Sequence, residues 1–198
     1  MIVLGLTGSI GVGKTTIASF LLQEGVAVCN TDLLVHELYR QKAIIAQIRN
    51  LFPEVIENGI VNRKKLAKIA FYSQKNLKKL EEMIHPYVRK AELFFLKRAY
   101  EEGCKIALID IPLLYETHAE SLFDYILVAS VPSHVQKKRV LSRFGMTEDM
   151  FSMILSYQDS NEEKCNKADF IINTDTERNT LQKNVRSLIA KICIMRRG

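Results

Sequence analysis

Short apolar segments alternate with longer segments of helical pattern along most of the chain. Five apolar segments have the length and branching of buried strands, and these are 2–6, 26–29, 105–110, 125–129 and 170–172. Helical patterns separate them, from a first helix over 14–24 to a last one over 177–195, whose basic tail is Arg196 and Arg197. This alternation predicts an α/β fold in which a five-stranded parallel sheet is flanked by helices on both faces.

The first predicted strand leads into the most specific motif of the sequence. Gly8, Gly13, Lys14 and Thr15 complete the pattern G-x-x-x-x-G-K-[ST]. Glycines let the backbone approach a phosphate closely, the lysine reaches the β- and γ-phosphates, and the threonine hydroxyl can bind Mg²⁺. The alternative is a glycine-rich turn with a chance lysine, but the motif has the preceding strand and the following helix that a phosphate-binding loop requires. The motif therefore predicts a P-loop, and the P-loop kinase arrangement places the strands in the order 2-3-1-4-5.

Two aspartates follow predicted strands. Asp110 comes after four apolar residues of the third strand, like the Walker B carboxylate that positions Mg²⁺. Thr31 and Asp32 follow the second strand and resemble the N-cap and first turn of a helix that continues through Leu38. Asp32 is therefore either a helix cap or a carboxylate delivered to the site from the end of a strand.

The region between the second and third strands is too long for a simple crossover. Asn58-Gly59 is a turn signal, and Asn62 is expected to cap a helix. A longer helical pattern from about 75 to 102 contains His85-Pro86, where proline must kink or restart the helix. These features predict a helical insertion, about 32–103, and in a phosphate-transfer enzyme such an insertion would hold the second substrate.

The segment after the fourth strand, about 132–167, is helical and basic at its start. Arg139 and Arg143 are four residues apart, which predicts that they share a helix face. Such a pair is either solvated surface or the lid that P-loop kinases close over ATP, and Gly145-Met146-Thr147 would be its hinge-like turn. If the pair belongs to a lid, removal of either arginine should leave stability almost unchanged and lower activity at least about tenfold.

The net charge of +6 and the sequence pI near 9.1 suit either a nucleic-acid binder or an enzyme with a polyanionic substrate. The basic residues are spread among helices without an aromatic strand motif, so we expect a small polyanion and no nucleic acid. The sequence Asn166–Asp169 spells the guanine-reading motif N-K-x-D, but it precedes a strand where that motif must follow one. We therefore interpret it as a chance match, which argues against a GTPase-like switch protein.

The cysteines and the apolar segments bear on location. The four cysteines are far apart and form no C-x-x-C pair, which favours reduced thiols in a cytoplasmic protein. No segment is apolar for the ~20 residues that a membrane helix needs, so we expect no membrane partner.

Over nearly its whole length the chain resembles the bacterial dephospho-CoA kinases. The resemblance rests on the P-loop, on Asp32, on Arg63 after Asn58-Gly59, and on further matches at His85-Pro86, the block DIPLLYE over 110–116, Gln136, Arg139, Arg143, Gln158 and Ala168-Asp169. It implies transfer of the γ-phosphoryl group of ATP to the ribose 3′-hydroxyl of dephospho-CoA, with Mg²⁺. Another nucleoside monophosphate or small-molecule P-loop kinase is the alternative.

The resemblance also implies roles for individual residues. Asp32, Lys14 and Arg139 would be catalytic, with Asp32 as the general base. Nucleotide would be held by Gly8, Gly11, Val12, Gly13, Lys14, Thr15, Thr16 and Arg143. Arg63, His85 and Leu113 would join Asp32 on the side of the acceptor, with a purely structural role as the alternative for His85, and Thr15 and Asp110 would hold the metal.

The implied organisation is a nucleotide core over about 1–31, 104–131 and 168–198, which carries the helical insertion and the lid, in a monomer or weak homo-oligomer. The chain departs from the family pattern at Asn30, where an aspartate is usual, at His36, at Phe144, and at Asn173-Thr174-Asp175 after the fifth strand.

Overall fold

The computed structural model describes residues 1–71 and 73–195, so Arg196 and Arg197 lie outside the described residues. The chain forms two compact units. The first unit combines Met1–Cys29 with Arg98–Gly198, and the second is Asn30–Lys97. The insertion expected over 32–103 overlaps this second unit.

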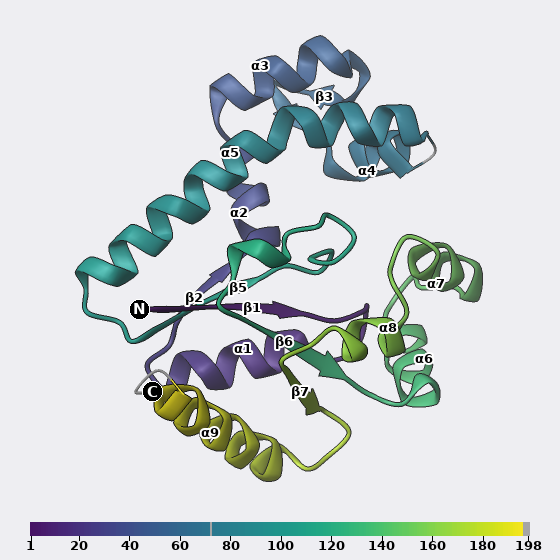
Figure 1. Cartoon of the computed structure of the whole chain (residues 1–198). Helices are drawn as coiled ribbons and strands as arrows, with labels where there is room; N and C mark the ends of the chain where they lie inside the picture. The colour runs from purple at the N-terminus through teal and green to yellow at the C-terminus, as the bar shows by residue number, and fades with distance from the viewer. Residues whose placement is uncertain (72, 196–198) are drawn as a thin grey trace. The chain divides into compact units, whose positions relative to one another are not determined.

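The first unit is built on a five-stranded sheet (Figure 1). Its strands are β1 (Ile2–Thr7), β2 (Ala27–Asn30), β5 (Ile106–Asp110), β6 (Tyr125–Ser130) and β7 (Phe170–Asn173). They lie in the order β2-β5-β1-β6-β7, which is the predicted order 2-3-1-4-5. The central strand β1 pairs in parallel with β5 and β6, with Leu4 opposite Leu108 and Gly5 opposite Ile126. The predicted α/β fold with a parallel sheet is therefore confirmed.

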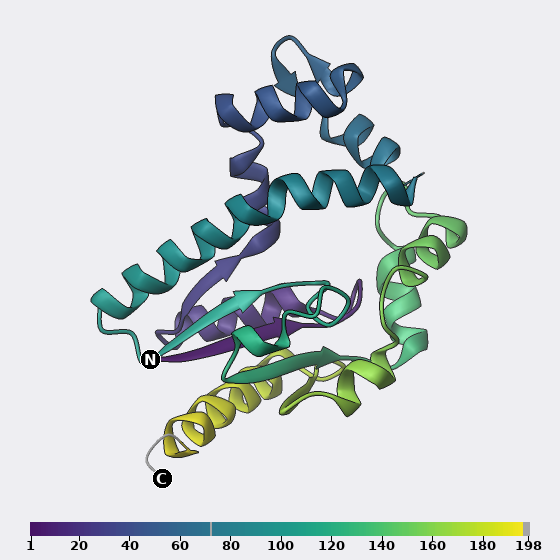
Figure 2. The ribbon, with the colours of Figure 1, turned by 45° about the horizontal axis from the view of Figure 1, so that its top comes forward.

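One face of this sheet is covered by α1 (Lys14–Gln23) and α9 (Arg178–Met195), which lie side by side in both ribbon views (Figures 1 and 2). The apolar residues of α9 recur at helical spacing, so they form one buried stripe: Leu181, Val185, Leu188 and Ile192. This stripe packs with Ile17 and Leu21 of α1 and with the strand residues Leu4, Leu6 and Leu127.

The other face of the sheet is covered differently. Ile126 and Val128 of β6 alternate with Leu127, so they point to the opposite face, where they pack against Leu114, Tyr115 and the short helix α8 (Asn161–Asn166). A Cβ atom on Gly5 of β1 would lie 2.8 Å from Leu114 Cδ1, so the segment after β5 packs directly on the sheet backbone.

The predicted lid segment contains α6 (Ser133–Leu141), α7 (Glu148–Leu155) and α8. Gly145 has a φ of +77°, and the Thr147 side chain caps α7 by accepting a hydrogen bond from the backbone N–H of Met150. The turn expected over 145–147 is therefore present. Lys137 Nζ and Glu148 Oε1 lie 3.0 Å apart and join α6 to α7.

The second unit contains α2 (Thr31–Leu38), α3 (Lys42–Leu51), a 3₁₀ turn (Pro53–Val55), the hairpin of β3 (Ile56–Glu57) and β4 (Ile60–Val61), α4 (Arg63–Phe71) and most of α5 (Gln74–Glu101). Its own core includes Leu38, Ile44, Ile48, Phe52, Leu66 and Leu80. Asn58 and Gly59 both have positive φ, as a two-residue hairpin turn requires. The Asn62 side chain accepts from the N–H of Lys65 at 3.1 Å, so its predicted capping role is confirmed.

The expectation for the long helix is only partly met. Of the two outcomes expected at Pro86, a kink or a restart, the structure excludes the restart because α5 is a single helix with Pro86 in its interior. No helix in the described part of the chain is long and apolar enough to cross a membrane.

Candidate active site

The phosphate-binding loop joins β1 to α1, and its backbone can be built only from glycine at several positions. Gly11 and Gly13 have φ of +81° and +92°, in the left-handed region that favours glycine. A Cβ atom on Gly8 would lie 2.6 Å from the carbonyl oxygen of Ala129. Gly13 is the N-cap of α1 and makes no side-chain capping bond, so the positive end of the helix is open toward an anion.

Two glutamines from the segment 132–167 hold the loop at Ile10. Gln136 Nε2 donates to the Ile10 carbonyl at 2.8 Å, and the Ile10 N–H donates to Gln158 Oε1 at 3.0 Å. A trans peptide places its C=O and N–H groups on opposite sides. The bond to the Ile10 carbonyl therefore turns the N–H of Gly11 away from Gln136.

Thr174, the first residue after β7, holds the next loop peptide in the same way. Its side chain is buried, and its hydroxyl donates to the Val12 carbonyl at 2.6 Å. This contact turns the N–H of Gly13 away from Thr174. Within the described residues, the N–H groups of Gly11 and Gly13 donate to no protein acceptor. Both are thus available for a phosphate oxygen.

Lys14 begins α1 and reaches back over the loop. Its Nζ donates to the carbonyl of Gly8 at 2.9 Å, which keeps the ammonium group beside the loop backbone. Thr15 and Thr16 follow in the first turn of the helix, and the Thr15 side chain is exposed. The loop, the lysine and the helix N-terminus together have the geometry and charge that can bind a phosphate chain.

The two predicted lid arginines have different environments. Arg139 lies in α6 and is half-buried, and it donates from Nη1 to Thr174 Oγ1 at 2.8 Å and from Nη2 to the Thr174 carbonyl at 3.0 Å. Arg143 is exposed and comes after the end of α6 at Leu141. The prediction that both arginines share a helix face is therefore wrong, because the helix ends between them.

Asp110 ends β5 beside the end of β1. Its register partner is Leu6, its side chain is buried, and the Ile111 N–H continues the ladder to the Leu6 carbonyl at 2.9 Å. Mg²⁺ prefers oxygen ligands and is usually bound through one or two protein groups, phosphates and water. The carboxylate of Asp110 and the hydroxyl of Thr15 are donors of this kind, so the residues present fit the metal. The described residues contain no cluster of three or more His, Cys, Asp or Glu side chains that could hold a metal alone.

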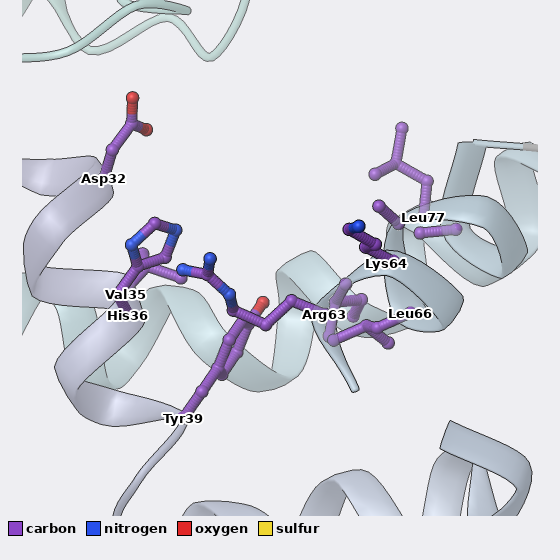
Figure 3. Close-up of a pocket in the computed structure, with 11 residues that line it drawn as sticks. Asp32, Val35, His36, Tyr39, Arg63, Lys64, Leu66 and Leu77 are labelled. Carbon is purple, nitrogen blue, oxygen red and sulfur yellow. The ribbon is translucent and has the colours of Figure 1, made fainter. Parts of the chain in front are cut away.

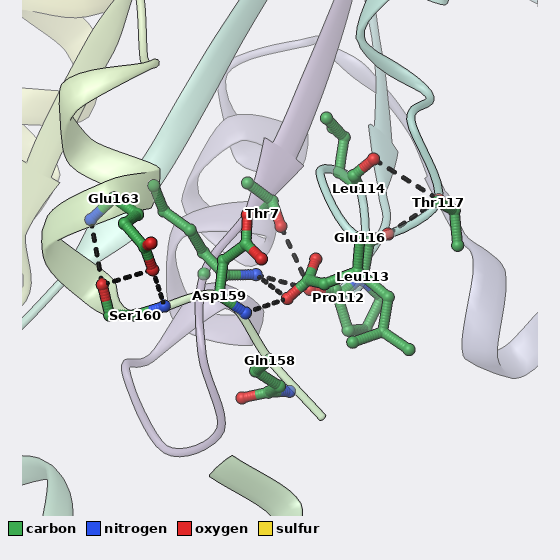
Figure 4. A network of polar contacts seen from close by, with 12 residues as sticks. Thr7, Pro112, Leu113, Leu114, Glu116, Thr117, Gln158, Asp159, Ser160 and Glu163 are labelled. Atoms are coloured by element: carbon green, nitrogen blue, oxygen red, sulfur yellow. Dashed lines mark hydrogen bonds and ion pairs between the residues drawn. The ribbon is translucent and has the colours of Figure 1, made fainter. Parts of the chain in front are cut away.

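A network of polar contacts fixes the segment that follows β5 (Figure 4). Thr7 at the end of β1 donates to the Pro112 carbonyl at 3.2 Å. Lys164 of α8 is fully buried and lies 2.7 Å from Glu116 Oε1, which also accepts from the Asp159 N–H at 2.8 Å. A buried lysine requires such a partner, so the pair ties the segment after β5 to α8.

The second unit contains a pocket of about 430 Å³ between α2, α4 and α5 (Figure 3). Asp32 and His36 line it from α2, and the Arg63 side chain points from α4 toward His36. The remaining lining residues are mostly apolar: Val35, Tyr39, Lys64, Leu66, Ala67, Ala70, Leu77 and Leu80. Burial raises the pKa of Tyr39 to about 12, so its hydroxyl stays protonated at neutral pH. The pocket can hold an anionic group and an apolar chain together.

Two residues implied on the acceptor side do not line this pocket. His85 is exposed on α5, and Leu113 belongs to the first unit. The Leu113 carbonyl accepts hydrogen bonds from the N–H and the hydroxyl of Thr117, at 3.0 and 2.7 Å.

The capping alternative for Asp32 is decided by Asn30. Asn30 is the N-cap of α2, and its side chain accepts from the N–H of Leu33 at 2.9 Å. Thr31 is the first residue of the helix, and Asp32 lies exposed in its first turn. The interpretation of Thr31 or Asp32 as the cap is therefore wrong.

The N-K-x-D sequence has a structural explanation. Asp169 Oδ2 accepts from the N–H of Ile126 at 2.7 Å, where β7 begins beside β6. The carboxylate thus joins the N-terminal ends of β6 and β7, at the end of the sheet opposite the loop that follows β7.

Several residues with clear contacts in the site were not predicted to have them. Gln136 and Gln158 were recognised only as matches to the family, and Thr174 only as a departure from it. Their partners in the loop lie 126, 148 and 162 residues away in the chain. The only sequence signal was indirect, since a buried polar residue beside a strand end needs a partner.

Comparisons with known proteins agree with this geometry. A family model described as dephospho-CoA kinase matches residues 2–180. The dephospho-CoA kinase of Bartonella quintana is 44% identical over 192 residues, covering 97% of this chain and 98% of the relative. That of Brucella melitensis is 45% identical over 189 residues, covering 96% and 94%. The crystal structure of TT1252 from Thermus thermophilus superposes with a TM-score of 0.85 at 28% identity, covering 96% of this chain and 97% of that one. The chain therefore belongs to the dephospho-CoA kinase family.

Proposed function

We propose that this protein transfers the γ-phosphoryl group of ATP to the ribose 3′-hydroxyl of dephospho-CoA, the last step of coenzyme A synthesis. The observation that carries this proposal is the complete phosphate-binding loop, whose Gly11 and Gly13 N–H groups are turned toward an anion by side chains behind the loop. Membership of the dephospho-CoA kinase family supports the acceptor.

Phosphoryl transfer depends on positioning and charge neutralisation more than on covalent chemistry. Lys14 and the N-terminus of α1 hold the phosphate chain. Arg139, which is hydrogen-bonded to Thr174, faces the negative charge that develops on the transferred group. Arg143, four residues later in the chain, supplies a second positive charge for the phosphates. Thr15 and Asp110 would hold Mg²⁺, which would supply positive charge to offset the negative charge of the phosphates.

The pocket of the second unit is proposed to hold the acceptor. Arg63 and Lys64 suit its pyrophosphate, and the apolar lining residues suit its aliphatic chain. Asp32 accepts the proton of the 3′-hydroxyl as that oxygen bonds to the γ-phosphorus and ADP leaves. Exclusion of water prevents hydrolysis of ATP in place of transfer. His85 and Leu113 are proposed to act on the acceptor side indirectly, since neither lines the pocket.

We further propose that the enzyme works in the cytoplasm as a monomer or weak homo-oligomer and binds no nucleic acid. Cys104, Cys165 and Cys193 are free thiols in the described structure, which is the state expected in a reducing compartment.

The proposed function is tested by a product assay. ATP is offered with dephospho-CoA, AMP, GMP or shikimate in parallel, and the products are analysed by mass spectrometry. We expect only dephospho-CoA to gain a phosphoryl group and to co-elute with authentic coenzyme A. Phosphorylation of AMP but not of dephospho-CoA would show instead a nucleoside monophosphate kinase.

A further inference from the structure

Thr174 lies at a junction between the phosphate-binding loop, α6 and β6. Its backbone N–H donates to the Ser130 carbonyl at 2.9 Å, so β6 fixes its main chain. Its side chain is only 5% exposed and contacts both α6 and the phosphate-binding loop.

The hydrogen-bond direction at this junction is determined by its chemistry. A guanidinium can only donate and a carbonyl can only accept. The Thr174 hydroxyl therefore accepts from Arg139 and must direct its single hydrogen to the Val12 carbonyl. The hydrogen bonds therefore run from Arg139 to the Thr174 hydroxyl and from that hydroxyl to the Val12 carbonyl. Because the hydroxyl accepts a bond from a cation, it becomes a stronger donor.

The contact also fixes the orientation of Arg139. Its two Nη groups bind two oxygens of one residue, which restrains the planar guanidinium against rotation. A lid arginine that is free in solution must lose rotamer freedom when nucleotide binds. Arg139 has lost most of that freedom before any ligand arrives.

Thr174 is also packed against the loop. A Cβ atom on Gly13 would lie 3.1 Å from Thr174 Oγ1 and 3.3 Å from both of its side-chain carbons. The threonine therefore packs against Gly13, the N-cap of α1, directly before Lys14. One side chain thus sets both the loop backbone and the arginine.

We infer that Thr174 is a positioning residue that orients Arg139 relative to the phosphate-binding loop, so that its charge is in place for phosphoryl transfer. The inference rests on the proposed function for the role of Arg139. Thr174 does not contact the reacting atoms and acts through the arginine.

The first test needs no acceptor substrate. NMR spectra record the side-chain N–H signals of Arg139, assigned by their loss in Arg139→Lys. In the parent protein without nucleotide, we expect separate Nη signals because rotation about the Nε–Cζ bond is restricted. Freely exchanging Nη signals in the folded parent would overturn the inference, and this outcome does not depend on whether any Thr174 variant folds.

The second test is kinetic. Thr174→Val keeps the shape of the side chain but removes the hydroxyl, and we expect kcat to fall about tenfold with a smaller change in KM for ATP. Thr174→Ser should recover at least half of the parental kcat. Thr176→Val, which removes an exposed hydroxyl two residues further on, is the matched control.

A double-mutant cycle separates positioning from packing. In an Arg139→Ala background, Thr174→Val should lower kcat by a clearly smaller factor than in the parent, because the arginine is already gone and only the bond to the Val12 carbonyl is still lost. An equal loss in both backgrounds would overturn the inference, as would a Thr174→Ser variant as slow as Thr174→Val. If the parent phosphorylates none of the acceptors offered, the proposed function fails, and the NMR result alone still decides whether Thr174 restrains Arg139.

Discussion

Lys14 contacts its own loop through the Gly8 carbonyl and belongs to no apolar cluster, so its removal should affect turnover far more than folding. We expect Lys14→Ala to lower kcat at least about 10²-fold, equivalent to ~2.7 kcal/mol of transition-state stabilisation. Lys14→Met, which keeps the apolar stem, is the matched variant and should be equally slow. Thermal melting and the coenzyme A assay measure the two effects. Near-normal turnover in either variant would contradict the role of Lys14.

Asp32 and Asn30 lie two residues apart and should respond to substitution in opposite ways. Asp32→Asn keeps size and polarity but makes a far poorer base, so we expect kcat to fall on the order of 10²-fold with stability unchanged. Asn30→Ala removes the cap that accepts from the Leu33 N–H and should cost about 1 kcal/mol of stability. Urea unfolding and steady-state kinetics distinguish these effects. If Asp32→Asn turns over like the parent, Asp110 becomes the carboxylate to test.

Sequence was a good guide at this scale where function depends on neighbouring residues. Gly8, Gly13, Lys14 and Thr15 are recognisable because one loop must bind phosphate by itself. The contacts of Thr174 and Gln136 depend on strand and helix packing across 162 and 126 residues, so no local pattern reveals them. The cap of α2 was misassigned by one residue because asparagine and threonine are both good caps.

The C-terminal end of α6 separates the environments of Arg139 and Arg143. Arg139 makes two hydrogen bonds to Thr174, whereas Arg143 is exposed beyond the helix end. We expect Arg139→Ala to lower the free energy of unfolding by about 1–2 kcal/mol and Arg143→Ala to change it by less than about 0.5 kcal/mol. This revises the expectation from sequence that both are structurally neutral. Urea denaturation with both variants checks it, and equal stabilities would show that the Thr174 contact adds nothing to folding.

Element types were easier to predict than element ends. The five strands and the helices α1 and α9 follow from apolar periodicity, which packing on one face of a sheet imposes. The continuous helix through Pro86 does not follow, because tertiary packing in the second unit offsets the local cost of a proline. The strands β3 and β4 are two residues each, too short for a periodic signal, although Asn58-Gly59 marked their turn.

At the scale of the first unit, the sheet positions groups that are distant in sequence at one set of strand ends. The phosphate-binding loop follows β1, Pro112 follows β5, and Thr174 follows β7. Hydrogen bonds join Thr7 at the end of β1 to Pro112, and Thr174 to Val12 of the phosphate-binding loop. This convergence is a property of parallel sheets, whose ligands bind beyond the C-terminal strand ends. The strand order therefore determines which loops can cooperate.

The Lys164–Glu116 pair is the contact on which the cohesion of this unit can be tested. It joins α8 to the segment after β5 across 48 residues, with the lysine side chain fully buried and the carboxylate 14% exposed. Loss of one partner leaves the other charge desolvated without compensation, so we expect Lys164→Met to cost about 3 kcal/mol of stability. Glu116→Gln, which keeps an acceptor for the Asp159 N–H, should also lower the stability of the protein because it leaves the buried Lys164 charge without a carboxylate partner.

The double variant Lys164→Met/Glu116→Gln should be more stable than Lys164→Met alone, because no uncompensated charge remains and the apolar stem still fills its space. Urea unfolding of the parent, the two single variants and the double variant gives the coupling energy, which we expect to be at least about 1.5 kcal/mol. Lys167→Met on the same segment, where the lysine is half-exposed, is the matched control and should change stability by less than about 1 kcal/mol. Additive effects of the two changes would mean that the pair contributes by packing alone, and that other contacts hold the segment after β5 in place.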